Sequence, residues 1–93
     1  ASTQITTPAQ LTPGLISMFS TVGNDAQHQL IEDNAGCLAS AVLAGGLTQR
    51  SLHFIAGGAP IGFGSVDAYL PVTRDAVTWN SAAFSSKLTG CLQ

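Results

Sequence analysis

Two cysteines, Cys37 and Cys91, constrain the fold of this 93-residue chain more than any other feature. They allow one intramolecular pairing, and in a small exported domain such a pair usually forms a disulfide. The bond would close a long loop, which contributes about 4 kcal/mol of stability in the chain-entropy model. It would also fix the end of the chain against the segment around Cys37. The competing interpretation is two buried free thiols in a cytosolic protein.

The segment 24–46 carries the clearest helical pattern. It opens with Asn24, and Gln27 follows three residues later, as in a capping box with Asn in place of Ser or Thr. Two glycines end it. Its apolar residues recur at intervals of three and four, which predicts one helix over 25–44 with Cys37 at the edge of the apolar stripe. The stripe consists of Leu30, Ile31, Ala35, Leu38, Ala41, Val42 and Leu43.

Two further helices are indicated nearer the ends of the chain. Two Thr–Pro pairs place an N-cap residue before a proline, and the apolar spacing that follows predicts a helix over 8–22. Thr73 is a suitable N-cap and Asp75 lies in the first turn of another helix, which we predict over 74–90. The apolar face of this last helix would consist of Val77, Phe84, Leu88 and Cys91.

The segment between these helices is ambiguous. Thr48 as an N-cap and Gly57 as a C-cap favour a helix over 49–56, although its apolar alternation is also compatible with a strand. We therefore expect an all-α fold, a small four-helix domain stapled by a disulfide. The alternative is an α+β fold with a short hairpin in 50–73.

The chain is expected to form one domain over 8–93, preceded by a flexible, polar N-terminus at 1–7. Its sequence begins at Ala1, and we interpret it as a mature chain whose signal peptide has been removed. The scarcity of lysine and the cysteine pair agree with export. We expect a secreted or cell-envelope location, outside the cytoplasm.

Charged residues make up only 9% of the chain, and the formal net charge is −2. The basic residues Arg50, Arg74 and Lys87 are scattered, whereas nucleic-acid binding needs clustered Lys and Arg. No apolar run approaches the ~18 residues of a transmembrane helix. We expect no nucleic-acid partner and no transmembrane segment, and the oligomeric state stays open.

The sequence contains no recognisable catalytic set. The nucleophile elbow G-x-S-x-G is absent, and a Cys–His pair would need a free thiol, which conflicts with a disulfide. The two cysteines, His28 and His53 lack the close spacing of a metal site. We expect no enzymatic activity, no catalytic residue, no metal and no cofactor.

The segment 59–73 mixes glycine and proline with large apolar side chains. Connections of this length are often functional, and aromatic anchors are enriched at binding surfaces. The alternative is that these side chains close the core. The candidate binding residues are Ile61, Phe63, Val66, Tyr69, Leu70 and, beyond the segment, Trp79.

These observations favour a non-enzymatic binding domain that engages a protein partner through the segment 59–73. An exposed apolar patch over 61–70 would support this function. One alternative is a carrier of an apolar small ligand or lipid, which an apolar cavity above ~300 Å³ would support. Another is a secreted toxin or effector. The carrier's cavity would be lined by Leu15, Phe19, Leu38, Leu52, Trp79 and Phe84.

The span 36–92 resembles small exported two-cysteine helical domains of actinobacteria, a family without a settled function. The resemblance implies a helical fold and export, and it implies no chemistry. The chain departs from the family in the apolar insertion at 59–73. The residues that carry the resemblance are Cys37, Gly46, Leu47, Thr48, Gly57, Cys91 and Leu92.

Overall fold

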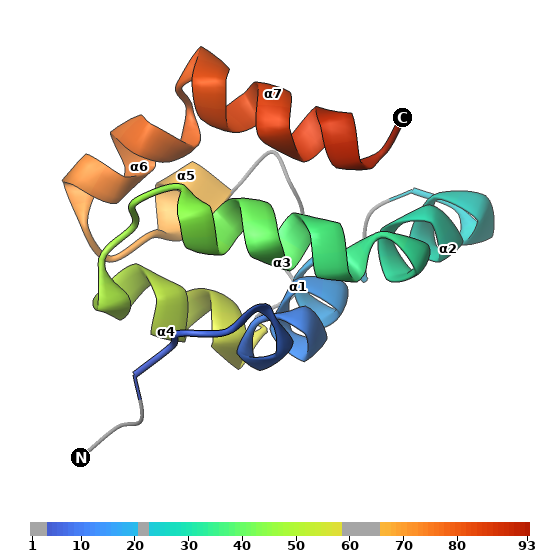
Figure 1. Ribbon diagram of the computed structural model, residues 1–93, viewed down its shortest axis with the longest axis horizontal. Coiled ribbons are helices and arrows are strands. Elements are labelled where there is room, and N and C mark those ends of the chain that lie inside the picture. The colour runs from blue at the N-terminus through green and yellow to red at the C-terminus, as the bar shows by residue number, and fades with distance from the viewer. Residues whose placement is uncertain (1–3, 21–22, 59–65) are drawn as a thin grey trace.

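Helices make up the regular structure of the chain (Figure 1). The computed structural model describes residues 4–20, 23–58 and 66–93, and within these ranges no strand occurs. The all-α prediction is thus confirmed, and the described part of 50–73 contains no hairpin. The elements are η1 (Pro8–Gln10), α1 (Thr12–Met18), α2 (Asp25–Asp33), α3 (Ala35–Ala44), α4 (Gln49–Gly57), α5 (Val66–Tyr69), α6 (Thr73–Trp79) and α7 (Ala82–Cys91).

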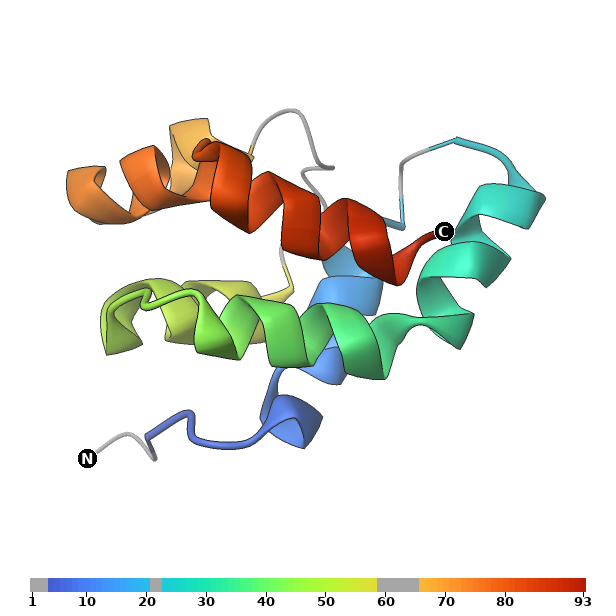
Figure 2. The same cartoon turned by 45° about the horizontal axis from the view of Figure 1, so that its top comes forward.

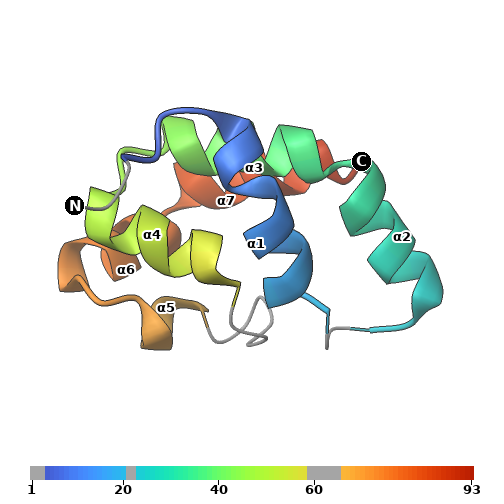
Figure 3. The same cartoon turned by 90° about the horizontal axis from the view of Figure 1, so that it is seen from below.

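Helix α3 is the central element of the fold. It contacts α1 and η1 on one side and α7 on the other, while α1 also packs against α4. Figure 2 shows α6 and α7 as a layer above α3 and α4. In Figure 3, the view from below, α1 and α4 lie in front of α3 and α7. Helix α2 projects from the N-terminal end of α3, and Ile31 is its only buried residue. The core therefore lies between α3 and the helices on either side of it.

The predicted helix 25–44 is two helices, α2 and α3, because the chain turns at Asn34. The start is as expected: Gln27 N donates to Asn24 Oδ1 at 3.0 Å, and Asn24 N donates to Gln27 Oε1 at 2.9 Å. At the break, Asn34 Nδ2 donates to the Leu30 carbonyl at 2.8 Å. The Asn34 N–H still donates to the same carbonyl at 3.2 Å, and α2 ends because the Asn34 backbone leaves the helical region, with φ −113° and ψ 13°.

The predicted helix 74–90 is also two helices, separated at Asn80 and Ser81. Ser81 Oγ accepts from Phe84 N at 3.2 Å and so caps a new helix, α7. The axis changes at this cap, so the helical spacing does not carry through it. As a result Val77 is 68% exposed, although its spacing placed it on one face with Phe84.

The first predicted helix, 8–22, is shorter and divided. A 3₁₀ turn, η1, precedes α1, and α1 ends at Met18. The residues 21–22 lie outside the described ranges. The N-terminal stretch is held to the domain, because Ile5 is buried and its N–H donates to Gln49 Oε1 at 2.8 Å. Ile5 is thus held against α4, and the flexibility of the stretch 1–7 stays a prediction.

The predicted helix 49–56 is confirmed as α4, and a glycine with positive φ follows both α3 and α4. Gly58 ends α4 with φ 72°, one residue after the expected position. Gly46 follows α3 with φ 82°, as the Gly–Gly pair predicted. These left-handed conformations favour glycine, because a Cβ would clash with the following carbonyl.

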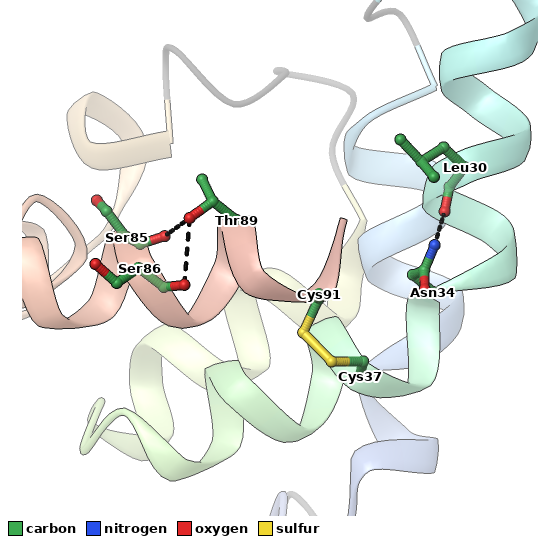
Figure 4. The surroundings of a disulfide bond; sticks show 7 residues. All are labelled: Leu30, Asn34, Cys37, Ser85, Ser86, Thr89 and Cys91. Atoms are coloured by element: carbon green, nitrogen blue, oxygen red, sulfur yellow. Dashed lines mark hydrogen bonds between the residues drawn. A yellow bond between two sulfur atoms is a disulfide. The ribbon is translucent and has the colours of Figure 1, made fainter. Parts of the chain in front are cut away.

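Cys37 of α3 and Cys91 of α7 form the disulfide that the sequence predicted (Figure 4). Their Cα atoms are 5.7 Å apart, and 54 positions separate them in sequence. Cys91 is buried, whereas Cys37 lies on the exposed side of α3. The bond therefore fixes the C-terminal turn of α7 against the first turn of α3.

Candidate functional site

The structure separates the six candidate binding residues. Ile61 and Phe63 lie outside the described residues. Val66 and Leu70 are buried in the core, and so they offer no surface to a partner. Tyr69 is 58% exposed on α5. The sixth residue, Trp79, is almost fully buried at the end of α6.

The residues expected to line a carrier's cavity fill the core instead. All six are at least nine-tenths buried, and they belong to one continuous apolar cluster. The alternative carrier function required a cavity lined by these side chains, and in the described chain they pack into the core cluster instead. They are Leu15, Phe19, Leu38, Leu52, Trp79 and Phe84.

An open groove of about 390 Å³ lies instead along α7, beside the end of α6. The α7 residues that line it recur at intervals of three and four, so they form one stripe along the helix. Trp79 closes the groove at the end of α6, where its ring packs against Phe84 at a centroid distance of 4.9 Å. The lining residues are Trp79, Asn80, Ser85, Leu88, Thr89 and Leu92.

The polar groups of this groove carry no charge. Asn80 Nδ2 donates to the Asp67 carboxylate at 3.1 Å, which leaves Asn80 Oδ1 without a partner in the described ranges. Thr89 Oγ1 donates back to the Ser85 and Ser86 carbonyls at 3.0 and 3.2 Å (Figure 4). The Ser85 hydroxyl makes no hydrogen bond to another described residue. The groove thus combines apolar walls with a few uncharged hydrogen-bonding groups, the usual composition of a small-molecule site.

A second, smaller cavity of about 80 Å³ lies between α1 and α2. It is well below the usual ~300 Å³ of a ligand site, and it has room for only a few water molecules. Nearby, His28 Nε2 is buried without a hydrogen-bond partner. No group of three or more His, Cys, Asp and Glu side chains gathers anywhere in the described ranges. The cavity is lined by Ile16, Phe19, Ser20, His28, Ile31 and Glu32.

Asp75 is the one fully buried acidic residue of the described chain, and it serves the fold. Its carboxylate accepts hydrogen bonds from Thr48 N at 3.1 Å and from the hydroxyls of Thr48 and Ser51. These donors form the first turn of α4, so Asp75 caps a helix other than its own. Burial alone would raise the pKa of Asp75, but these hydrogen bonds and the nearby Arg74 outweigh it and hold the pKa below its usual value.

Sequence reasoning missed both the groove and the role of Asp75. We placed Asp75 in the first turn of its own helix, where a carboxylate complements the dipole. Nothing in the sequence marked Ser85 and Thr89 as binding residues, because isolated hydroxyl residues on an exposed helix face are common. Only Trp79 of the groove was among the predicted site residues.

The chain matches no protein-family model, and neither a curated protein nor a solved structure matches it. Among the described residues, no helix is both long enough and apolar enough to cross a bilayer. Arguments about function therefore rest on the geometry of the groove, the disulfide and the exposed side chains.

Proposed function

We propose that this chain is a non-enzymatic binding domain that takes an apolar small molecule in the groove along α7. The observation that carries the proposal is the groove of about 390 Å³ beside Trp79. This volume lies within the ~300–1,000 Å³ typical of small-molecule sites, and an aromatic side chain and two leucines supply its apolar walls. The carrier function is thus favoured over a protein partner at 59–73, but in a different place from the one expected.

A location outside the cytoplasm belongs to the same proposal. The Cys37–Cys91 disulfide supports it, since structural disulfides persist mainly in oxidising compartments. The resemblance to exported two-cysteine domains points in the same direction. An extracytoplasmic domain that carries a small apolar molecule needs no catalytic group, which agrees with the non-enzymatic character of the proposal.

The volume of the groove sets the scale of the expected affinity. At ~30 Å³ per water-sized group, the groove holds a ligand portion of about a dozen heavy atoms. With about 0.5 kcal/mol per atom, the binding free energy is roughly −6 kcal/mol, or a Kd on the order of 50 μM. Titrations should therefore extend a few-fold above this Kd and stay within the aqueous solubility of the ligand.

A pair of substitutions on α7 tests the proposal. Thr89→Phe places an aromatic ring in the groove, whereas Ser86→Phe adds the same ring to an exposed position that does not line it. Trp79, the only tryptophan, reports on the groove by its emission. We expect butylbenzene to shift this emission saturably in the native chain and in Ser86→Phe, and to lose most of its affinity in Thr89→Phe. Equal responses in both variants, or no saturable response in the native chain, would refute the proposal.

The protein-partner function remains the second candidate, because Tyr69 is 58% exposed. An aromatic side chain at this exposure is a suitable anchor for a partner. A photo-reactive amino acid at position 69 should then cross-link one defined protein in extracts of the source, and the same group at Ser40, an exposed residue of α3, should not. Cross-linking that is equal at the two positions would count against this candidate.

A further inference from the structure

We propose that the ligand of the α7 groove is an uncharged amphiphile with one hydroxyl end, of the long-chain alcohol class. This inference rests on the proposed function and adds the chemistry and the orientation of the ligand. It follows from three features of the groove: its described lining residues carry no ionisable group, the lining polar groups without a partner lie toward the start of α7, and the Asp67 carboxylate accepts a hydrogen bond from Asn80.

The absence of ionisable groups selects against charged ligands. None of the six lining residues carries a charge, so a charged end group would lose hydration without gaining an opposite charge. The Asp67 carboxylate, 3.1 Å from Asn80 Nδ2, adds repulsion against an anionic end. It is not itself a lining residue, so a cationic end in the groove would gain only indirect attraction from it.

One end of the groove, here called the polar end, holds the lining polar groups that have no hydrogen-bond partner among the described residues, although Trp79 also lies there and Thr89 lies between the two leucines. Asn80 and Ser85 lie toward the start of α7, whereas Leu88 and Leu92 lie toward its end. At 1.5 Å per residue, Ser85 and Leu92 are separated by about 10 Å along the helix. A molecule with one polar end and an apolar body of about this length fits that arrangement.

The free hydrogen-bonding groups at the polar end suit a hydroxyl. Asn80 Oδ1 is an acceptor, and the Ser85 hydroxyl can donate or accept, and neither has a partner among the described residues. A ligand hydroxyl can donate to Asn80 Oδ1 while it accepts from Ser85 Oγ. Thr89 does not compete as a donor, because its hydroxyl proton is bonded to the carbonyls of its own helix.

The test is a titration of the full, oxidised chain with ten-carbon ligands below their micelle concentrations, followed by Trp79 emission. The ligands are 1-decanol, decanoate and decylammonium, and butylbenzene serves as an apolar probe without a polar end. We expect decanol to bind at least tenfold more tightly than either charged ligand. Ser85→Ala should weaken decanol about fivefold, the effect of one neutral hydrogen bond, and leave butylbenzene unchanged. The matched variant Ser86→Ala should change neither.

The outcomes separate this inference from the proposed function. If decanoate or decylammonium binds as tightly as decanol, or if Ser85→Ala weakens butylbenzene as much as decanol, the inference is refuted while the groove remains a ligand site. If no ligand, butylbenzene included, changes the emission saturably, both the inference and the proposed function are refuted.

Discussion

Replacement of Asp75 should cost this domain a large part of its stability. The side chain is fully buried, and its carboxylate is the acceptor for three donors of the first turn of α4. Asp75→Ala removes that acceptor and leaves the N–H and hydroxyl of Thr48 and the hydroxyl of Ser51 without it. Ser51 is fully buried and Thr48 is partly buried, so water cannot replace the lost acceptor of the Ser51 hydroxyl and can replace that of Thr48 only in part.

The size of the effect follows from the number of bonds and their burial. One hydrogen bond to a charged group contributes about 1.5–3 kcal/mol, and loss of one member of a buried network costs about 3–5 kcal/mol. Since a small domain has a total stability of about 5–15 kcal/mol, Asp75→Ala should lower Tm by about 15–30 °C. Asp75→Asn keeps the shape and one acceptor oxygen, so we expect a smaller loss of about 1–3 kcal/mol.

The same contacts give stability a defined pH dependence. Because the pKa of Asp75 is lower in the folded chain than in the unfolded chain, its contribution is fully present above the unfolded value of about 3.9. It is lost as the pH falls below that value toward the folded pKa. The stability difference between the native chain and Asp75→Asn should therefore be constant from pH 7 to about pH 5 and shrink below pH 4.

Urea unfolding followed by circular dichroism measures both effects. Asp33→Asn is the matched control, since Asp33 is exposed and accepts one side-chain bond from Gln29, and it should change stability by less than about 0.5 kcal/mol. The reasoning is refuted if Asp75→Asn costs no more than this control. It is also refuted if the cost of Asp75→Asn persists unchanged at pH 3.

Three further variants have effects of known direction on the free energy of unfolding, and urea unfolding measures each of them. Gly14→Ala should destabilise by about 1–3 kcal/mol, because its Cβ would overlap the Ile55 carbonyl oxygen, whereas Gly36→Ala should stabilise by up to about 1 kcal/mol because its Cβ would meet no atom within 4 Å. A stabilising Gly14→Ala would contradict the close packing of α1 on α4. Replacement of Cys37 and Cys91 together by serine should cost about 4 kcal/mol, and a loss below 1 kcal/mol would show that the bond constrains the unfolded chain little.

Local signals predicted the ends of helices well. The capping box at Asn24 and Gln27 and the helix stop at Gly46 depend on residues within one turn of each other, and both occur as predicted. The disulfide was also predictable, since two cysteines allow one pairing. These features share a cause: few alternatives exist once the residue types are known.

The predicted helices were wrong in length because apolar spacing does not register a change of axis. The stripe of 25–44 continues across Asn34, where the non-helical backbone of one residue ends the first helix and its side chain bonds the Leu30 carbonyl. The pair Asn80 and Ser81 carried a usable signal, since both residues favour helix caps over helix interiors. Long-range contacts such as Asp75 with Thr48 have no local signature at all, because 27 positions separate the two residues.

The candidate site depends on the break that sequence reasoning missed. Because α7 restarts at Ser81, it buries Phe84, Leu88 and Cys91, and the adjacent stripe that includes Ser85 and Thr89 forms the groove beside Trp79. In a continuous helix over 74–90, Trp79 would not lie beside the stripe of α7 residues that lines the groove. The disulfide joins Cys91, at the end of α7, to the first turn of α3, so it ties the helix that carries the groove to the central helix of the fold. The proposed site therefore lies on the C-terminal helix pair, whereas the sequence directed attention to the segment 59–73.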